Sequence, residues 1–204
     1  MNATDEPPVR QTDIIGYVRR CLSDAHCDHT ERRFPFVTVT YAQSLDGCIA
    51  HAQGQTLQLS NPHSLELTHQ LRAIHDGILV GINTVVRDNP RLNVRLAEGK
   101  NPQPIVVDGR LRFPMDANLL KEPCVPPIIC TSHSACEVKE QRLVDAGAKV
   151  MRVAQCSQGL LDLEQLLEGL KQLGLRSIMV EGGATVITSL LASGLADQYL
   201  VRCV

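Results

Sequence analysis

Short apolar runs alternate with amphipathic stretches along most of this chain. Runs of β-branched and aliphatic residues predict buried strands at 37–41, 78–80, 105–107, 128–130, 149–153, 177–180 and 198–204. Helical spacing of apolar residues predicts helices at 12–24, 135–146 and 162–173, one that opens at Asn61-Pro62, and one from 183 to about 192. This alternation predicts an α/β fold with a mostly parallel sheet and helices on both faces.

The length and the order of these elements suggest one domain with an arm. A chain of 204 residues suits a single sizeable domain. We expect residues 1–33 to form an N-terminal arm with a short helix, and residues 34–204 to form the domain that carries function. Strand and helix signals alternate throughout the second range, and it contains no internal repeat.

Composition excludes several classes of partner. Aromatic residues make up only 3% and Trp is absent, so stacking platforms for nucleic-acid bases are not expected. The net charge of −2 and the dispersed basic residues argue against a nucleic-acid or membrane surface. The N-terminus lacks a secretory signal, and the eight cysteines then indicate reduced thiols in a cytoplasmic protein.

Polar residues gather where predicted strands end. The run 78–80 stops at Gly81 and is followed by Thr84 and Asp88, and the strand 177–180 runs into Glu181-Gly182-Gly183. Ligands of parallel α/β sheets bind at strand ends, and paired glycines let a phosphate approach the backbone at a helix N-terminus. An ordinary βα connection and a tight turn are the alternatives for these two segments.

Two further strand ends carry charged residues. Asp46 lies in Ser44-Leu45-Asp46-Gly47, which also suits a tight turn without any function. Arg110 and Arg112 follow the strand at 105–107. Basic groups at such a position suit the 2′-phosphate of NADP, although surface charges explain them equally well.

Together these segments resemble one family. The motifs are Ser44-Leu45-Asp46-Gly47, Leu71-Arg72-Ala73, the stretch 77–92, Val106-Val107-Asp108 and Val180-Glu181-Gly182-Gly183. In this order they resemble the riboflavin-biosynthesis pyrimidine reductases, the reductase domain of the RibD type, over about residues 35–204. The resemblance implies a dihydrofolate-reductase-like fold and NADPH-dependent reduction of a 5-phosphoribosylamino-pyrimidine, either deaminated or diamino, to its ribitylamino form. It also implies homodimers.

The resemblance also implies roles for individual residues. Cofactor contacts match Gln43, Gln58, Thr84, Asp88, Gly109, Gly182, Gly183, Ala184, Thr185 and Val186. Substrate contacts match Thr56, Arg72, Leu92, Arg95 and Glu181, with Arg72 and Arg95 suited to the 5′-phosphate. Asp46 and Glu181 are the expected catalytic residues. The segment Asp76-Gly77-Ile-Leu-Val-Gly slightly favours the family members that act on the diamino substrate.

Some features depart from this family. Relatives continue beyond the strand 198–204 into a terminal hairpin, so we expect a C-terminally truncated domain that lacks it. Many members carry an aromatic residue where Gln58 stands. The alternatives are therefore a non-catalytic binding or assembly subunit, or another pteridine or pyrimidine reductase of the same fold.

No metal is expected. A zinc deaminase requires His-x-Glu and a later Pro-Cys-x-x-Cys, and the second motif is not present after Pro123-Cys124. Cys21, His26, Cys27 and His29 have irregular spacing for a zinc site, which favours a polar linker.

Overall fold

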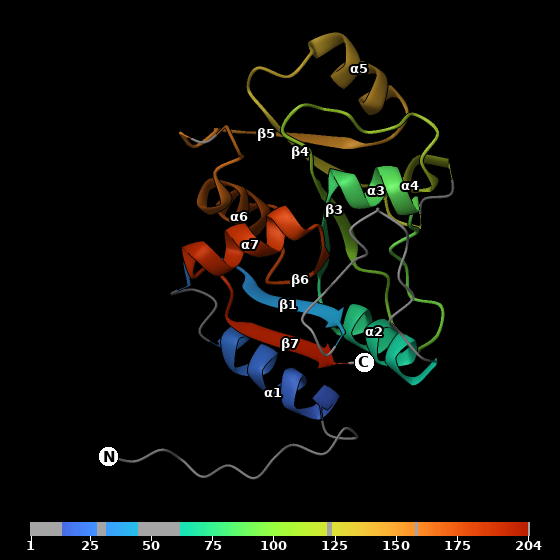
Figure 1. Cartoon of the computed structure of the whole chain (residues 1–204), viewed down its shortest axis with the longest axis vertical. Coiled ribbons are helices and arrows are strands. Elements are labelled where there is room, and N and C mark those ends of the chain that lie inside the picture. Colours follow the sequence, from blue (N-terminus) through green and yellow to red (C-terminus); the bar gives the residue numbers. More distant parts are fainter. Residues whose placement is uncertain (1–13, 28–31, 45–61, 122–123, 158, 204) are drawn as a thin grey trace.

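The computed structural model describes residues 14–27, 32–44, 62–121, 124–157 and 159–203. In these ranges seven parallel strands form one sheet in the order β5-β4-β3-β2-β6-β1-β7 (Figure 1). The strands are β1 (Phe36–Gln43), β2 (Gly77–Gly81), β3 (Gln103–Val107), β4 (Ile128–Ser132), β5 (Lys149–Val153), β6 (Ser177–Gly182) and β7 (Gln198–Cys203). The predicted α/β class is confirmed, and the carboxyl ends of all these strands share one edge.

The helices are α1 (Ile14–Cys27), α2 (Pro62–Ile74), α3 (Ile82–Asp88), α4 (Asn118–Lys121), α5 (Glu137–Asp145), α6 (Leu163–Gln172) and α7 (Ala184–Ser193). The sequence did not predict α3 or α4. In α3 only Ile82 and Val85 are buried, so it shows a single apolar pair three residues apart. A helix this short carries too few turns for a periodic signal.

The side chains of successive strand residues pack into different layers, as strand geometry requires. Leu79 joins the apolar layer under α6 and α7. Ile78 and Val80 join the opposite layer with residues of α3 and α5, and on the same side Met179 packs with α1 and α2. Figure 1 shows α6 and α7 together on one side of the strands. Helices therefore cover both faces, as predicted.

Local sequence explains the most regular helix, α6. Asp162 caps its N-terminus by accepting a hydrogen bond from the Gln165 backbone N–H at 3.1 Å. Leu166, Leu167 and Leu170 are buried on one face. Burying each leucine stabilises the fold by about 1.5–3 kcal/mol.

The predicted helix near the N-terminus is also present and packs against the domain. In α1, Val18, Leu22 and Ala25 are buried and contribute to one cluster with Leu71 and Met179. Their spacing of three to four residues places all three on one helical face. Among the described helices, none is long and apolar enough to span a membrane.

Candidate active site

The site is built on neighbouring strand ends. The chain passes from β2 outwards through β3, β4 and β5, then returns and inserts β6 between β2 and β1. Because all pairs are parallel, Gln43, Gly81 and Glu181 lie at the carboxyl ends of three adjacent strands. Such a position beside a change in strand order is where open α/β sheets bind ligands.

Glycines bring the ends of β2 and β6 into close contact. A Cβ on Gly183 would lie 3.2 Å from both Cα and N of Gly81, and Gly183 has φ +90°. A Cβ on Gly182 would lie 3.6 Å from Oγ1 of Thr84. Three residues that the sequence singled out, Thr84, Gly182 and Gly183, therefore share one small region. Gly183 is also the N-cap of α7 without a side-chain cap, so the first N–H groups of α7 lack an intrahelical acceptor.

A bulge places Glu181. The register of β2 with β6 runs from Leu79↔Val180 directly to Val80↔Gly182, so Glu181 is the extra residue on β6. Bulges bend a strand and re-aim a side chain, and they recur beside active sites. The Glu181 carboxylate meets α2 rather than open solvent.

Arg72 and Glu181 form a bidentate ion pair. Arg72 Nε donates to Glu181 Oε1 at 2.6 Å, and Nη2 donates to Oε2 at 2.6 Å. Their side chains are 11% and 15% exposed, so water screens the pair weakly. Arg72 Nη1 also donates to the Asn93 carbonyl at 2.9 Å. Glu181 is thus a largely buried and partnered carboxylate rather than a solvated one.

The segment after α3 joins the same cluster. Arg95 Nη1 donates to Asn93 Oδ1 at 3.0 Å, and the Arg95 backbone N–H donates to His69 Nδ1 at 3.2 Å. His69 is buried, and burial together with the nearby Arg72 and Arg95 charges lowers its pKa to about 4. The imidazole is therefore neutral at physiological pH.

Arg202 brings a third guanidinium near Glu181. It lies in β7, and its Nη1 donates to the Ser64 carbonyl, Ser64 Oγ and Thr68 Oγ1 at 2.8, 2.9 and 2.6 Å. Burial lowers the pKa of Arg202, and the Glu181 charge acts in the opposite direction. Arg72, Arg95 and Arg202 together with the one carboxylate of Glu181 leave this cluster with a net positive charge, which favours an anionic ligand.

The end of β3 holds a second group of polar residues. Asp108 is fully buried, and its Oδ2 accepts a hydrogen bond from the Phe113 N–H at 2.8 Å. Burial raises the pKa of this carboxyl, whereas hydrogen bonds from the Arg112 and Phe113 backbone act to lower it. Arg112 Nη2 donates to Asn83 Oδ1 at 3.0 Å, which links this strand end to α3.

The remaining predicted residues are spread more widely. Asp88 is exposed at the end of α3, whereas Leu92 is buried in the apolar layer with φ +51°. Gly109 follows β3, and a Cβ there would lie 3.6 Å from Leu161. Ala184, Thr185 and Val186 form the first turn of α7. Asp46, Thr56 and Gln58 lie outside the described residues.

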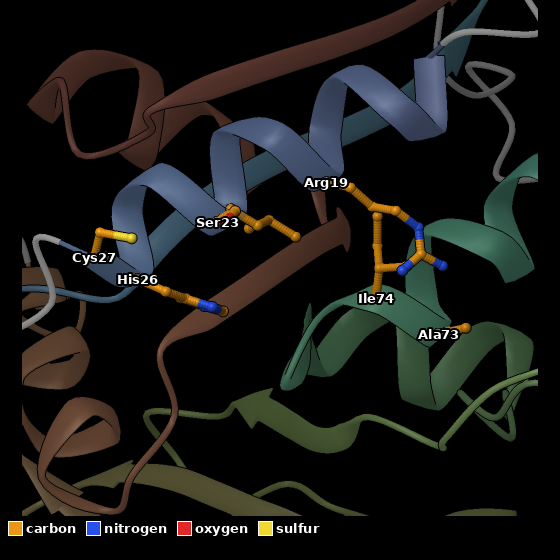
Figure 2. A pocket seen from close by; sticks show the side chains of 7 residues that line it. Arg19, Ser23, His26, Cys27, Ala73 and Ile74 are labelled. Carbon is orange, nitrogen blue, oxygen red and sulfur yellow. The ribbon is translucent and has the colours of Figure 1, made fainter.

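Hollows elsewhere in the described chain do not include these residues. A groove of about 500 Å³ lies between α1 and α2 and is lined by Arg19, Leu22, Ser23, His26, Cys27, Ala73 and Ile74 (Figure 2). Another, of about 530 Å³, lies between β5 and α6. Neither lining includes a predicted cofactor or substrate residue.

Sequence reasoning missed several members of the cluster. His69 precedes Arg72 by three residues on α2, a spacing that places both on one helical face and could have indicated a shared role. Asn93 acts in part through its backbone carbonyl, which no side-chain pattern reveals. Arg202 carries no functional signal in the sequence, because it lies within a predicted strand.

Comparison with known proteins agrees with the fold and the motifs. The model of the RibD C-terminal domain family matches residues 35–204. A relative from Archaeoglobus fulgidus, named 2,5-diamino-6-ribosylamino-4(3H)-pyrimidinone 5′-phosphate reductase, is 38% identical over 177 residues, covering 82% of this chain and 78% of the relative. The protein of the same name from Saccharomyces cerevisiae is 38% identical over 189 residues, covering 88% and 75%.

Solved structures show the same likeness. The structure of Saccharomyces cerevisiae riboflavin biosynthesis reductase Rib7 superposes with a TM-score of 0.68 at 31% identity, covering 90% of this chain and 80% of that one. Acinetobacter baumannii RibD gives a TM-score of 0.75 at 26% identity, covering 89% of this chain and 49% of that one.

Proposed function

This chain belongs to the RibD C-terminal domain family, the pyrimidine reductases of riboflavin biosynthesis, and we propose that it uses NADPH to reduce the diamino-pyrimidinone substrate. The observation that carries the proposal is the meeting of two sites on β6. The glycine contact with β2 and the Arg72–Glu181 pair are built from consecutive residues, 181 to 183. A cofactor and a sugar phosphate bound there would be neighbours.

The strand-end glycines fit a dinucleotide. A side chain on Gly183 would fill the space beside Gly81, so the absence of side chains leaves the backbone open to a phosphate. The uncapped N–H groups of Ala184, Thr185 and Val186 would bind the pyrophosphate oxygens, aided by the helix dipole. When bound, the reduced nicotinamide supplies a hydride. Thr84 would fix the cofactor from the α3 side.

NADPH rather than NADH is proposed from the charge at the end of β3. Arg112 is held by Asn83, and Arg110 is exposed two residues earlier in the same loop. Two guanidinium groups at one strand end would pair with a 2′-phosphate, which NADH lacks. Gly109 lies immediately before them.

The basic cluster suits the phosphate of the substrate. Arg72 donates to Glu181 from Nε and from one N–H of Nη2, and to the Asn93 carbonyl from one N–H of Nη1. The described residues leave the second N–H on each Nη without a partner, and these groups would bind phosphate oxygens together with Arg95. Glu181, fixed by Arg72, would accept hydrogen bonds from pyrimidine amino groups with its other lone pairs.

The proposed reduction requires correct placement of substrate and cofactor more than covalent catalysis by the protein. Reduction of the ring-opened imine places a hydride on the sugar C1′ and a proton on the imine nitrogen, and the C=N bond becomes single. The protein therefore has to hold the acceptor carbon against the nicotinamide and exclude competing orientations. Asp46 and Glu181 remain the proposed catalytic carboxylates, and homodimers remain a prediction.

The diamino substrate is favoured by two observations. The segment Asp76-Gly77-Ile-Leu-Val-Gly is more typical of the reductases that act on the diamino substrate. Relatives named 2,5-diamino-6-ribosylamino-4(3H)-pyrimidinone 5′-phosphate reductase align at 32–38% identity. The test is oxidation of NADPH in the presence of either the diamino-pyrimidinone or the deaminated uracil form. We expect turnover with the diamino form and much slower turnover with NADH. Preference for the uracil form would refute the substrate assignment.

A matched pair of variants tests the cofactor assignment. Arg110→Ala should raise KM for NADPH and leave KM for NADH nearly unchanged. Arg142→Ala, an exposed change on α5, is the control and should alter neither. Equal effects of Arg110→Ala on both cofactors would remove Arg110 from the 2′-phosphate site.

The alternative is a non-catalytic subunit that kept the fold. It is favoured by Gln58, which stands where many relatives carry an aromatic residue. The absence of any thermal shift with millimolar NADPH would support this alternative against the reductase.

A further inference from the structure

We propose that His69 is a positioning residue: its imidazole holds the Arg95 backbone against α2 and thereby aims Arg72 and Arg95 at one sugar phosphate. This inference rests on the proposed function, because it assigns the phosphate site a third, buried member. His69 would not touch the substrate. It acts through the segment 93–95, which carries contacts to both arginines.

Hydrogen bonds connect His69 to both arginines through the segment 93–95. His69 Nδ1 accepts from the Arg95 N–H at 3.2 Å, so the segment 93–95 is attached to the middle of α2. Asn93 in that segment accepts from Arg72 through its carbonyl at 2.9 Å and from Arg95 through Oδ1 at 3.0 Å. Releasing the segment from His69 would loosen one partner of each guanidinium. The two arginines would then lose their common orientation.

The surroundings keep the acceptor available. His69 is 2% exposed, and the charged groups that face it are Arg72, Arg95 and Glu181. Burial and the two arginines lower its pKa to about 4, whereas Glu181 and the Asn93 backbone act in the opposite direction. A neutral ring that accepts at Nδ1 carries its proton on Nε2. Two cations beside a buried ring thus keep Nδ1 unprotonated.

Other side chains would not serve equally. A charged acceptor, Asp or Glu, would compete with the phosphate for Arg72 and Arg95. An apolar side chain would leave the Arg95 N–H unpaired in a partly buried position. Asparagine offers an oxygen at about the position of Nδ1, and leucine has the same shape without that oxygen. His69→Asn and His69→Leu are therefore a matched pair.

Binding of ribose 5-phosphate to the full chain, measured by calorimetry, tests the proposal without requiring turnover. We expect His69→Leu to weaken binding about tenfold, and His69→Asn to restore most of the affinity. KM for NADPH should stay within about twofold of wild type in both variants, as expected for a local hydrogen bond. With the pyrimidine substrate, the KM advantage of the phosphorylated form over its phosphate-free riboside should shrink in His69→Leu.

Equal affinities of the Leu and Asn variants, or an equal loss of NADPH affinity, would overturn the role of His69. A wild-type chain that binds ribose 5-phosphate but reduces neither pyrimidine would refute the proposed reductase activity without contradicting the positioning role of His69. No binding of ribose 5-phosphate by the wild type would refute the positioning role itself. If His69→Leu does not fold, the ¹⁵N spectrum of the wild-type imidazole decides, because a protonated Nδ1 excludes the bond from Arg95.

Discussion

Gly183→Ala tests whether the contact between β2 and β6 is needed for cofactor binding. Gly183 has φ +90° and ψ 100°, a conformation that costs an L-residue about 1–3 kcal/mol. The new Cβ would also lie 3.2 Å from Cα and N of Gly81, both backbone atoms that cannot rotate away. Overpacking of this kind costs about 1–3 kcal/mol more. The expected loss is a large part of the stability of a single domain.

A second glycine supplies the control. Gly174 also has φ +90°, but no atom lies within 4 Å of its ideal Cβ. Gly174→Ala therefore measures the conformational cost alone, and the difference between the two variants isolates the close approach to Gly81. Both are compared by urea denaturation at constant pH, with the slope of the transition checked for two-state behaviour.

Cofactor binding is measured on the same two variants. Gly183→Ala should raise KM for NADPH at least tenfold, because the methyl group would push the ends of β2 and β6 apart and displace the backbone N–H groups that are proposed to bind phosphate. Gly174→Ala, between α6 and β6, should leave that KM unchanged. Equal losses of stability in both variants, together with an unchanged KM in Gly183→Ala, would refute a role of the Gly81–Gly183 contact in cofactor binding.

The remaining predictions concern charge. Arg72→Ala should raise KM for the pyrimidine phosphate by about a hundredfold or more, because it would remove a proposed phosphate partner and leave a largely buried carboxylate unpaired; Arg176→Ala, an exposed control, should leave this KM unchanged. His69 and His75 both have lowered pKa values, mainly through burial, so the unfolded chain binds protons that the folded chain does not. The contribution of the two histidines to the free energy of unfolding should therefore be level above pH 6.5 and fall as pH decreases from 6.5 towards about 4, less steeply in His69→Asn; the same pH dependence in the wild type and in His69→Asn would contradict this. Asp108→Asn keeps an acceptor for the Phe113 N–H and removes a buried charge, so at neutral pH the urea midpoint should be equal or higher, whereas Asp108→Ala should lower stability by about 1–3 kcal/mol. A clear loss in Asp108→Asn would show that the charge itself is required.

The fold was predictable where local patterns are strong. The runs that became β2, β4 and β6 are short and apolar, and α6 repeats leucine with helical spacing, so their types follow from the sequence. The helices α3 and α4 are too short to show a period. The order of the strands was not predicted either, because no local property of residues 177–182 says that β6 pairs with both β2 and β1.

The site was predictable as a set of residues but not as a set of contacts. Arg72 and Glu181 were each expected to touch substrate, and their separation of 109 positions gave no reason to expect a bond between them. That bond depends on the bulge at Glu181, which is a property of two strands in register. His69 was overlooked because a histidine on a helix has many ordinary explanations, and its role appears only when Arg95 is placed beside it.

The bulge at Glu181 would also explain how the end of one strand could serve the two proposed ligands. Without the bulge, Glu181 would pair with Val80 and Gly182 with Gly81, so Gly183 would lie one position beyond Gly81. With it, Gly182 pairs with Val80 and Gly183 reaches Gly81, while the Glu181 side chain is released towards Arg72. A single inserted position therefore sets both the closeness of the two glycine-bearing strand ends and the direction of the carboxylate. In the proposed reductase, this would fix the distance between cofactor and substrate through the backbone rather than through flexible side chains, which is what efficient hydride transfer requires.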